Sequence, residues 1–391
     1  MFAVFRRPRN LLLRLAAVAS VLMLAACDPS AMGAFGPRLD SGAPVPVALL
    51  VPGGAGNSGD EILARGLRQA AELAIADLQG VAIDLRVYNT GGDPAQAALV
   101  ATQAADDGAL IILGPVFAEA ANAAGRAVAA RGINVLSFSN NTDIAGGNVF
   151  VLGPTFPNTA SRLVRYAARQ GKTRIMVLNE QTAAGEAGAR AIAGAIARQG
   201  LLPAGGYAYP FSQEGVIAAI PDIAARAGSG EVDAVFMTAD TAGSLSYLTQ
   251  LLPERGVDMA RVQFIGLTRW DVPPSTLSLP GVQGGWFALP DPALSSQFQA
   301  RYQATFGEPP SPLAGLAYDG IAAIGALVQS GNSGALTASG LTQGAGFVGV
   351  NGIFRLLADG SNERGLAVAE VRNNQVNVID PAPRSFAGAG F

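Results

Sequence analysis

Histidine is absent from the 391-residue sequence, and cysteine occurs once. Without histidine the chain lacks the usual proton shuttle and the commonest imidazole metal ligand, so a Ser-His-Asp triad is excluded. A single cysteine forms neither an internal disulfide nor a thiolate cluster, which excludes zinc fingers, iron–sulfur sites and disulfide frameworks. Charged residues make up only 14% of the sequence, against about 25% in an average soluble domain. That scarcity excludes a disordered chain or one that coats nucleic acid.

The N-terminus has the layout of a secretory signal peptide, which we assign to residues 1–26. Four arginines without an acid precede the apolar run 15–26. Leu24-Ala25-Ala26-Cys27 then resembles the lipobox of bacterial lipoproteins, which implies that Cys27 becomes a lipidated N-terminus. The alternative is an incidental cysteine beside an ordinary cleavage site. The resemblance favours a lipid anchor in a bacterial membrane, facing the periplasm, and leaves inner and outer membrane open.

The segment that follows the signal has no apolar periodicity. Residues 27–44 are rich in turn formers, so we expect the lipidated cysteine to be followed by a flexible tether. The net charge of −3 becomes more negative once the arginine-rich signal is removed, which disfavours nucleic acid as a partner.

From residue 45 onward, short apolar runs alternate with amphipathic windows, a pattern typical of βαβ units in a parallel sheet. Expected strands fall in two series, interrupted by Gly153-Pro154: 45–51, 81–87, 109–113 and 134–138, then 174–178, near 207, 233–238, 263–267 and 282–289. A terminal β-meander follows at 353–357, 367–371 and 376–379. Asp359-Gly360 and Asn373-Asn374 between these strands suit tight hairpin turns.

The two series predict an α/β fold with two lobes, in which parallel sheets are flanked by helices. We expect residues 45–153 with 290–340 to form the first lobe, 154–289 with 341–382 the second, and 383–391 a tail. Ligand sites in such sheets lie at the carboxyl ends of the strands, so the architecture predicts a clamshell with a cleft between the lobes.

A glycine-rich segment between the first strand and its helix matches the dinucleotide fingerprint G-x-G-x-x-G over residues 54–59. The second strand, however, ends at Asn89 rather than at an acid that would hold a ribose. A glycine-rich turn over a ligand cleft is therefore the favoured interpretation. Ser58 and Glu61 fit a capping box that would start the helix.

Carboxylates follow several expected strands, at Glu119, Glu180, Asp240 and Asp271. Such groups could pair for acid–base catalysis, but spacing in sequence establishes no pairing, and binding of a polar ligand is favoured. No G-x-S-x-G elbow occurs. We therefore expect no enzyme activity, no catalytic residue, no metal and no cofactor.

The body resembles the type I periplasmic-binding-protein fold of the Leu/Ile/Val-binding class. The resemblance rests on 47–52 with its glycine loop, Leu113-Gly114-Pro115, the polar segment 137–142 and Ala317-Tyr318-Asp319. Amino-acid-binding members carry serines after the Gly-Pro position and an aromatic-glycine pair after the first strand of the second lobe. Here Phe117-Ala118-Glu119 and Thr182-Ala183 stand there, which argues against amino-acid transport.

Segments 266–271 and 349–383 are similar to a lipoprotein branch known as penicillin-binding-protein activators. That resemblance implies a membrane-tethered protein that stimulates a peptidoglycan synthase by contact. The alternative is the substrate-binding component of an ABC importer for amino acids or similar small polar ligands, with a permease as its partner. Either protein could hold a small molecule in the cleft.

The expected cleft combines residues of both lobes. The first lobe would supply Phe117, Glu119, Ser137, Ser139, Asn140 and Thr142, and the rest would be Glu180, Thr182, Asp240, Arg269, Trp270 and Tyr318. Thr142 and Asp240 are also suited to capping a helix or fixing a turn. Trp286, within an apolar strand, is expected in the core instead.

Overall fold

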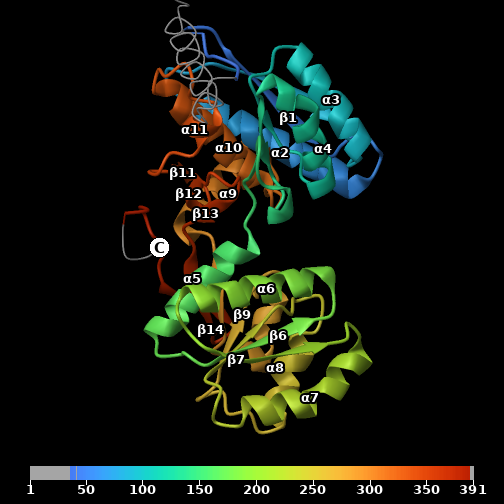
Figure 1. The fold of residues 1–391 in the computed structure, drawn as a ribbon, viewed down its shortest axis with the longest axis vertical. Helices are drawn as coiled ribbons and strands as arrows, with labels where there is room; N and C mark the ends of the chain where they lie inside the picture. Colours follow the sequence, from blue (N-terminus) through green and yellow to red (C-terminus); the bar gives the residue numbers. More distant parts are fainter. Residues whose placement is uncertain (1–35, 41, 388–391) are drawn as a thin grey trace, which may run out of the picture.

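The computed structural model describes residues 36–40 and 42–387, which form two lobes stacked along the long axis of the molecule (Figure 1). Each lobe is an α/β unit with a largely parallel sheet between two layers of helices, which confirms the predicted fold class. The predicted signal peptide and Cys27 lie outside the described residues. None of the helices in the described ranges is long and apolar enough to cross a bilayer.

Lobe 1 contains a parallel five-stranded sheet in the order β2-β1-β3-β4-β5. The strands are β1 (Val45–Val51), β2 (Ile83–Asn89), β3 (Ile111–Leu113), β4 (Asn134–Ser137) and β5 (Val149–Val151). The helices are α2 (Ser58–Asp77), α3 (Pro94–Asp106), α4 (Ala118–Val128), α9 (Pro292–Phe306), α10 (Ala314–Gln329) and α11 (Ala338–Leu341).

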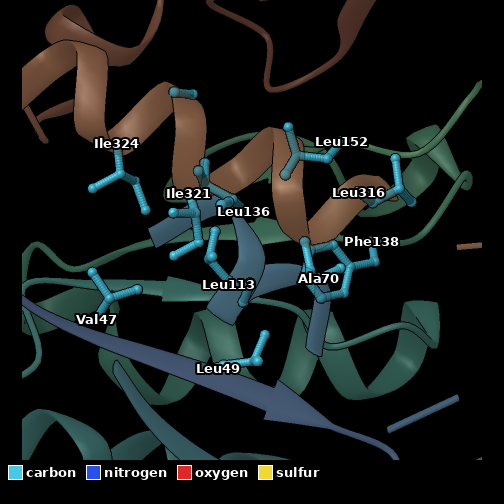
Figure 2. Packing of buried hydrophobic residues seen from close by; sticks show 14 of the residues in the cluster. Val47, Leu49, Ala70, Leu113, Leu136, Phe138, Leu152, Leu316, Ile321 and Ile324 are labelled. Atoms are coloured by element: carbon cyan, nitrogen blue, oxygen red, sulfur yellow. The ribbon is translucent and has the colours of Figure 1, made fainter. Parts of the chain in front are cut away.

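The apolar run of β1 is continuous because both faces of this sheet are covered. Successive side chains point to opposite faces, so Leu49 packs with α2 and α10 whereas Leu50 packs with α3 and α4. Figure 2 shows Ile321 and Ile324 of α10 directed toward Leu113 and Leu136 of the sheet.

Lobe 2 contains a seven-stranded sheet in the order β15-β14-β10-β9-β8-β6-β7. Its parallel strands are β6 (Ile175–Glu180), β7 (Pro203–Tyr209), β8 (Ala234–Met237), β9 (Gln263–Gly266) and β10 (Trp286–Leu289). Helices α5 (Phe156–Arg169) and α6 (Ala183–Arg198) cover one face, and α7 (Gln213–Ala227) and α8 (Leu245–Glu254) cover the other. Short 3₁₀ helices occur in lobe 1 at Ala129–Arg131 and Thr142–Ile144 and in lobe 2 at Pro274–Ser278 and Pro280–Val282.

The terminal strands are antiparallel, as predicted, but they divide between the lobes. β14 (Ala367–Arg372) and β15 (Gln375–Asp380) extend the lobe 2 sheet, joined by Asn373 and Asn374 with φ of 53° and 60°. A separate sheet of β11 (Phe347–Gly349), β12 (Gly352–Leu356) and β13 (Asn362–Arg364) packs instead into the lobe 1 core. The expected assignment of the whole of 341–382 to lobe 2 is corrected for these strands, because Phe347 and Phe354 pack with the residues of α10.

The chain crosses between the lobes after β5, after β10 and after β13. A buried ion pair stands where these crossings meet: Asp319 of α10 lies 3.0 Å from Arg364 of β13. The Arg364 Nε also donates to the carbonyl of Leu152 at 2.9 Å, and Asn362 donates to the carbonyls on either side of Leu152. These bonds tie the first and third crossings to α10.

Candidate functional site

The loops that follow β1, β2 and β3 gather at one edge of lobe 1, because carboxyl ends of parallel strands meet there. The Gly91 amide donates to the Gly53 carbonyl at 2.9 Å, which joins the first two loops. The ring of Phe117 lies against Gly92 so closely that a Cβ there would be 3.0 Å from it. We call this set of loops, with the loop after β4, the lobe 1 edge.

The glycine motif at this edge is a turn that caps α2. Asn57 accepts a hydrogen bond from the Gly59 amide, and Glu61 accepts one from the Gly54 amide at 2.7 Å. The expected capping by Ser58 is wrong, since Asn57 holds that position one residue earlier. Asn89 packs against Gly54, where a Cβ would lie 3.1 Å from the Asn89 Cβ. The geometry agrees with a glycine-rich turn and gives no carboxylate at the end of β2.

The polar segment after β4 holds two buried serines that fix their own turn. Ser137 donates to the Pro115 carbonyl at 3.0 Å and accepts from the Ser139 amide at 3.1 Å. Ser139, 5% exposed, accepts from the amide of Asn141. Asn140 is exposed, and its side chain has no hydrogen-bond partner among the described residues. Asn140 is therefore an exposed side chain of this segment that remains free for a ligand.

The N-terminus of α4 adds further donors to the lobe 1 edge. Phe117 precedes this helix, is 41% exposed and provides no side-chain cap. Within the described ranges, the amides of Ala118 and Glu119 have no hydrogen-bond acceptor. Unsatisfied amides at the start of a helix attract anionic or carbonyl oxygens. Glu119 is exposed in the same turn, so its carboxylate offsets part of that attraction.

At the corresponding edge of lobe 2, Glu180 ends β6 and is 6% exposed. Its Oε1 accepts hydrogen bonds from the amide and the hydroxyl of Ser244, the residue immediately before α8. Ser244 also lies 2.7 Å from the hydroxyl of Tyr209, whose pKa burial raises above its usual value. Glu180 therefore caps α8 through Oε1, while no described residue donates to its Oε2.

Asp240 and Phe211 come together with Glu180 around Gly243. A Cβ on Gly243 would lie 3.0 Å from Glu180 Oε1 and Asp240 Oδ1 and 3.2 Å from the Phe211 ring. Phe211, after β7, is 59% exposed, and Asp240, after β8, is exposed as well. In the part of the chain that the structure describes, neither carboxylate has an ion-pair partner. We call these three residues the lobe 2 edge.

Trp270 does not belong to either edge, so its predicted cleft role is wrong. Its side chain is fully buried and stacks on Phe287 with ring centroids 6.4 Å apart. The Trp270 side chain points into the core, where it packs in one cluster with residues of α8 and β10, while Arg269 and Val272 beside it are exposed. Trp286 is buried in the core as predicted, with its ring 4.9 Å from that of Tyr166.

The prediction that Tyr318 lies in the cleft is also wrong. Its hydroxyl donates to Asp77, the last residue of α2, where Arg301 pairs with the same carboxylate. A helix rises about 1.5 Å per residue, so this end of α2 lies roughly 28 Å from the loop of β1. Tyr318 links α10 to α2 instead of facing a ligand.

Two further predicted residues serve local structure. Thr182 caps α6, because its Oγ1 accepts from the Gly185 amide at 2.9 Å. Arg269 is held by Asp271 through a bond of 2.8 Å from Nε to Oδ1. Thr142 lines a cavity at the junction of the two lobes, together with residues of α5 and the segment 357–364. Of the predicted set, Phe117, Glu119, Asn140, Glu180 and Asp240 remain candidates for ligand contact at the two edges.

Sequence reasoning missed Phe211 and Ser244. Phe211 stands two residues after the end of β7, in the same relation to its strand as other expected ligand residues. The expected strand near residue 207 was too poorly bounded to show this. Ser244 could not be found from spacing, because its contact with Glu180 joins residues 64 positions apart.

The two edges remain separate in this structure. No hydrogen bond joins the loops after β1–β4 to those after β6–β9 within residues 36–40 and 42–387. Lobe 1 offers neutral donors beside an aromatic ring, whereas lobe 2 offers carboxylates beside another ring. The arrangement suits a small ligand held between two half-sites.

Comparison with known proteins gives one family. A model described as "Periplasmic binding protein" matches residues 44–375. No curated protein sequence matches the chain.

Several solved structures share this fold. A putative branched-chain amino acid ABC transporter protein from Rhodospirillum rubrum has a TM-score of 0.74 at 19% identity, covering 86% of this chain and 100% of its own. A periplasmic ligand-binding protein of a branched chain amino acid ABC transporter from Burkholderia xenovorans gives 0.68 at 15%, covering 87% and 96%. A solute binding protein from R. palustris, solved with benzoate, gives 0.57 at 18%, covering 89% and 99%.

Proposed function

We propose that this chain, which belongs to the periplasmic binding protein family, is the substrate-binding component of an ABC importer and takes up a small ligand with a protonated amine. Membership implies a periplasmic location and a binding role rather than catalysis. The observation that carries the proposal is the pair Glu180 and Asp240, which share one edge without an ion-pair partner among the described residues.

An ammonium group is the natural partner for this pair. Neither carboxylate has an ion-pair partner among the described residues, and a charged donor forms a stronger hydrogen bond with a carboxylate than a neutral donor does. At the lobe 1 edge, the free amides of Ala118 and Glu119 suit an oxygen at the other end of the ligand. Phe117 and Phe211 would cover an apolar middle portion, which makes an amino acid with an apolar side chain the best match.

A calorimetric panel tests this proposal. Leucine, phenylalanine, 4-methylpentanoate, which lacks the amine of leucine, and benzoate would each be titrated into the protein. We expect an amino acid to bind and its amine-free analogue to bind at least about tenfold more weakly, since a hydrogen bond to a charged group contributes roughly 1.5–3 kcal/mol. Equal affinity for leucine and 4-methylpentanoate would refute a role for the amine.

Glu180→Gln keeps the acceptor that caps α8 but removes the charge, so it should weaken amino-acid binding without unfolding lobe 2. Glu231→Gln is the matched control, because Glu231 is exposed in lobe 2 and its side chain has no partner among the described residues. The same loss of affinity in both variants would show a general charge effect rather than a contact at this site.

Activation of a peptidoglycan synthase stays a prediction from resemblance. The segment 349–383 that carried this resemblance also builds the hinge and completes both lobes, which accounts for much of its sequence without a partner. If no ligand of the calorimetric panel bound and a peptidoglycan synthase co-purified with the protein, the activator would be favoured over the importer.

The lipid anchor at Cys27 is likewise a proposal, which rests on Leu24-Ala25-Ala26-Cys27. Mass spectrometry of the mature N-terminus tests it. An unmodified cysteine or cleavage at another position would remove the anchor from the account.

A further inference from the structure

A second concave site lies at the junction of the lobes, away from the lobe 2 edge. This cavity has a volume of about 570 Å³. One wall comes from lobe 1, with Thr142 and the segment 357–364, and the other from α5 and the last turn of α6. The last turn of α6 lies roughly 22 Å along the helix from Thr182, so this hinge cavity is distinct from the lobe 2 edge.

The wall of the hinge cavity is rich in arginine, although the chain as a whole is acidic. Arg162, Arg165, Arg198 and Arg364 line it, against the two carboxylates of Asp359 and Glu363. Glu363 is already paired with Arg355, and Asp359 accepts hydrogen bonds from Ser361.

Two of these arginines have no carboxylate partner. Arg198 donates to the Ser161 hydroxyl at 2.8 Å, and Arg165, half-buried on α5, has no hydrogen bond or ion pair among the described residues. Burial, together with the positive charge of Arg162, lowers the pKa of the Arg165 guanidinium. An arginine remains charged at neutral pH even so, because its usual pKa is above 12.

Arg162 provides an independent sign of a missing partner. This residue is 6% exposed, and its other nitrogens are occupied by Asp380 and by the Leu366 carbonyl. Its Nη1 is buried and has no hydrogen-bond partner among the described residues. Orphaned buried donors are rare in folded proteins, and a charged one is especially costly. Arg364, by contrast, is fully engaged by Asp319 and Leu152.

We propose that the hinge cavity binds a small oxyanion, the carboxylate or phosphate group of a metabolite, through Arg165, Arg198 and Arg162. Guanidinium groups pair with both kinds of oxyanion through two parallel hydrogen bonds. All three arginines come from α5 and the last turn of α6, so the lobe 2 wall of the cavity supplies the contacts to the anion. This site does not depend on the proposed importer function, because its ligand needs no amine.

Titration calorimetry with citrate and with inorganic phosphate, at constant ionic strength, tests the site on the full mature chain. Binding of citrate alone identifies carboxylates as the ligand class, binding of phosphate alone identifies phosphates, and binding of both identifies oxyanions in general. The double variant Arg165→Ala and Arg198→Ala should lose at least about tenfold in affinity for the bound probe.

The matched control is Arg126→Ala with Arg190→Ala. It changes the net charge equally, and both of these arginines are exposed, outside the hinge cavity and without partners among the described residues. We expect the control to bind as tightly as the unchanged protein. Failure of both probes to bind, full affinity in the cavity double variant, or equal loss in the control would each overturn the proposal. Binding of leucine at the two edges is measured in a separate titration. A failure to bind leucine would therefore not change the interpretation of the citrate and phosphate titrations.

Discussion

Trp270 fills space that two neighbouring glycines leave open. A Cβ built on Gly266 would lie 2.2 Å from the indole Nε1, and one on Gly285 would lie 2.1 Å from the ring. Both approaches are far below van der Waals contact, so the ring is accommodated because these positions lack side chains. This fit explains how an indole so near the end of β9 can be wholly buried.

Trp270→Ala should therefore lower the free energy of unfolding by about 3–5 kcal/mol, the usual cost of removing a large aromatic side chain from a core. Trp270→Phe should cost less, because in the part of the chain that the structure describes the indole Nε1 has no hydrogen-bond partner to lose. Urea denaturation measures both variants. If Trp270→Phe kept its stability but lost affinity for the cleft ligand, Trp270 would have a direct role in the cleft, contrary to the packing described here.

The ion pair of Asp319 and Arg364 is the most deeply buried in the described chain, with side-chain exposures of 0% and 4%. Removing one partner leaves an uncompensated charge, so Arg364→Ala should destabilise the protein by about 3–5 kcal/mol. Arg372→Ala is the control: its pair with Glu370 leaves Arg372 62% exposed, and exposed pairs contribute about 0–1 kcal/mol. Similar small losses in both variants would show that the buried pair does not hold the hinge.

At the scale of elements, the C-terminal strands are structural in both lobes. β12 supplies Phe354 to the lobe 1 core, and β14 supplies Val368 to the lobe 2 core, next to β10. Neither lobe can close its core without this segment. A C-terminal deletion is therefore unsuitable as a test for a partner-binding surface.

A chain that ends at Gly346 should lose cooperative thermal unfolding, because β11–β15 are then absent from both cores. A chain that ends at Ala387 keeps every structurally described residue and should melt like the full protein. Circular dichroism at rising temperature distinguishes the two. A sharp transition at an unchanged midpoint in the shorter chain would contradict the packing described here.

Much of this element pattern could be predicted because it depends on local periodicity. The alternation in β1, the proline that begins α3 and the Asn373-Asn374 turn all act within a few residues of one another. The sheet that β12 joins could not be predicted, since pairing and packing partners lie far away in sequence. The same holds for Glu180 with Ser244, and for Trp270, whose burial depends on Gly285 across the sheet.

At the scale of the whole molecule, each lobe has its own buried core on both faces of its sheet, and the chain passes between the lobes at three crossings. The first and third crossings are tied together around Leu152 by Arg364 and Asn362. Such a molecule can change the angle between its lobes with little repacking of either core.

A ligand that contacts both edges should therefore bring the lobes together. Small-angle X-ray scattering should give a smaller radius of gyration at saturating concentration of whichever amino acid binds in the calorimetric panel. Glu180→Gln, measured at the same ligand concentration, should keep the larger radius, because the ligand then lacks its charged partner on lobe 2. An unchanged radius in the liganded protein, with tight binding shown by calorimetry, would mean that the ligand occupies one lobe alone, and that the carboxylates of Glu180 and Asp240 and the amides of α4 are not parts of one site.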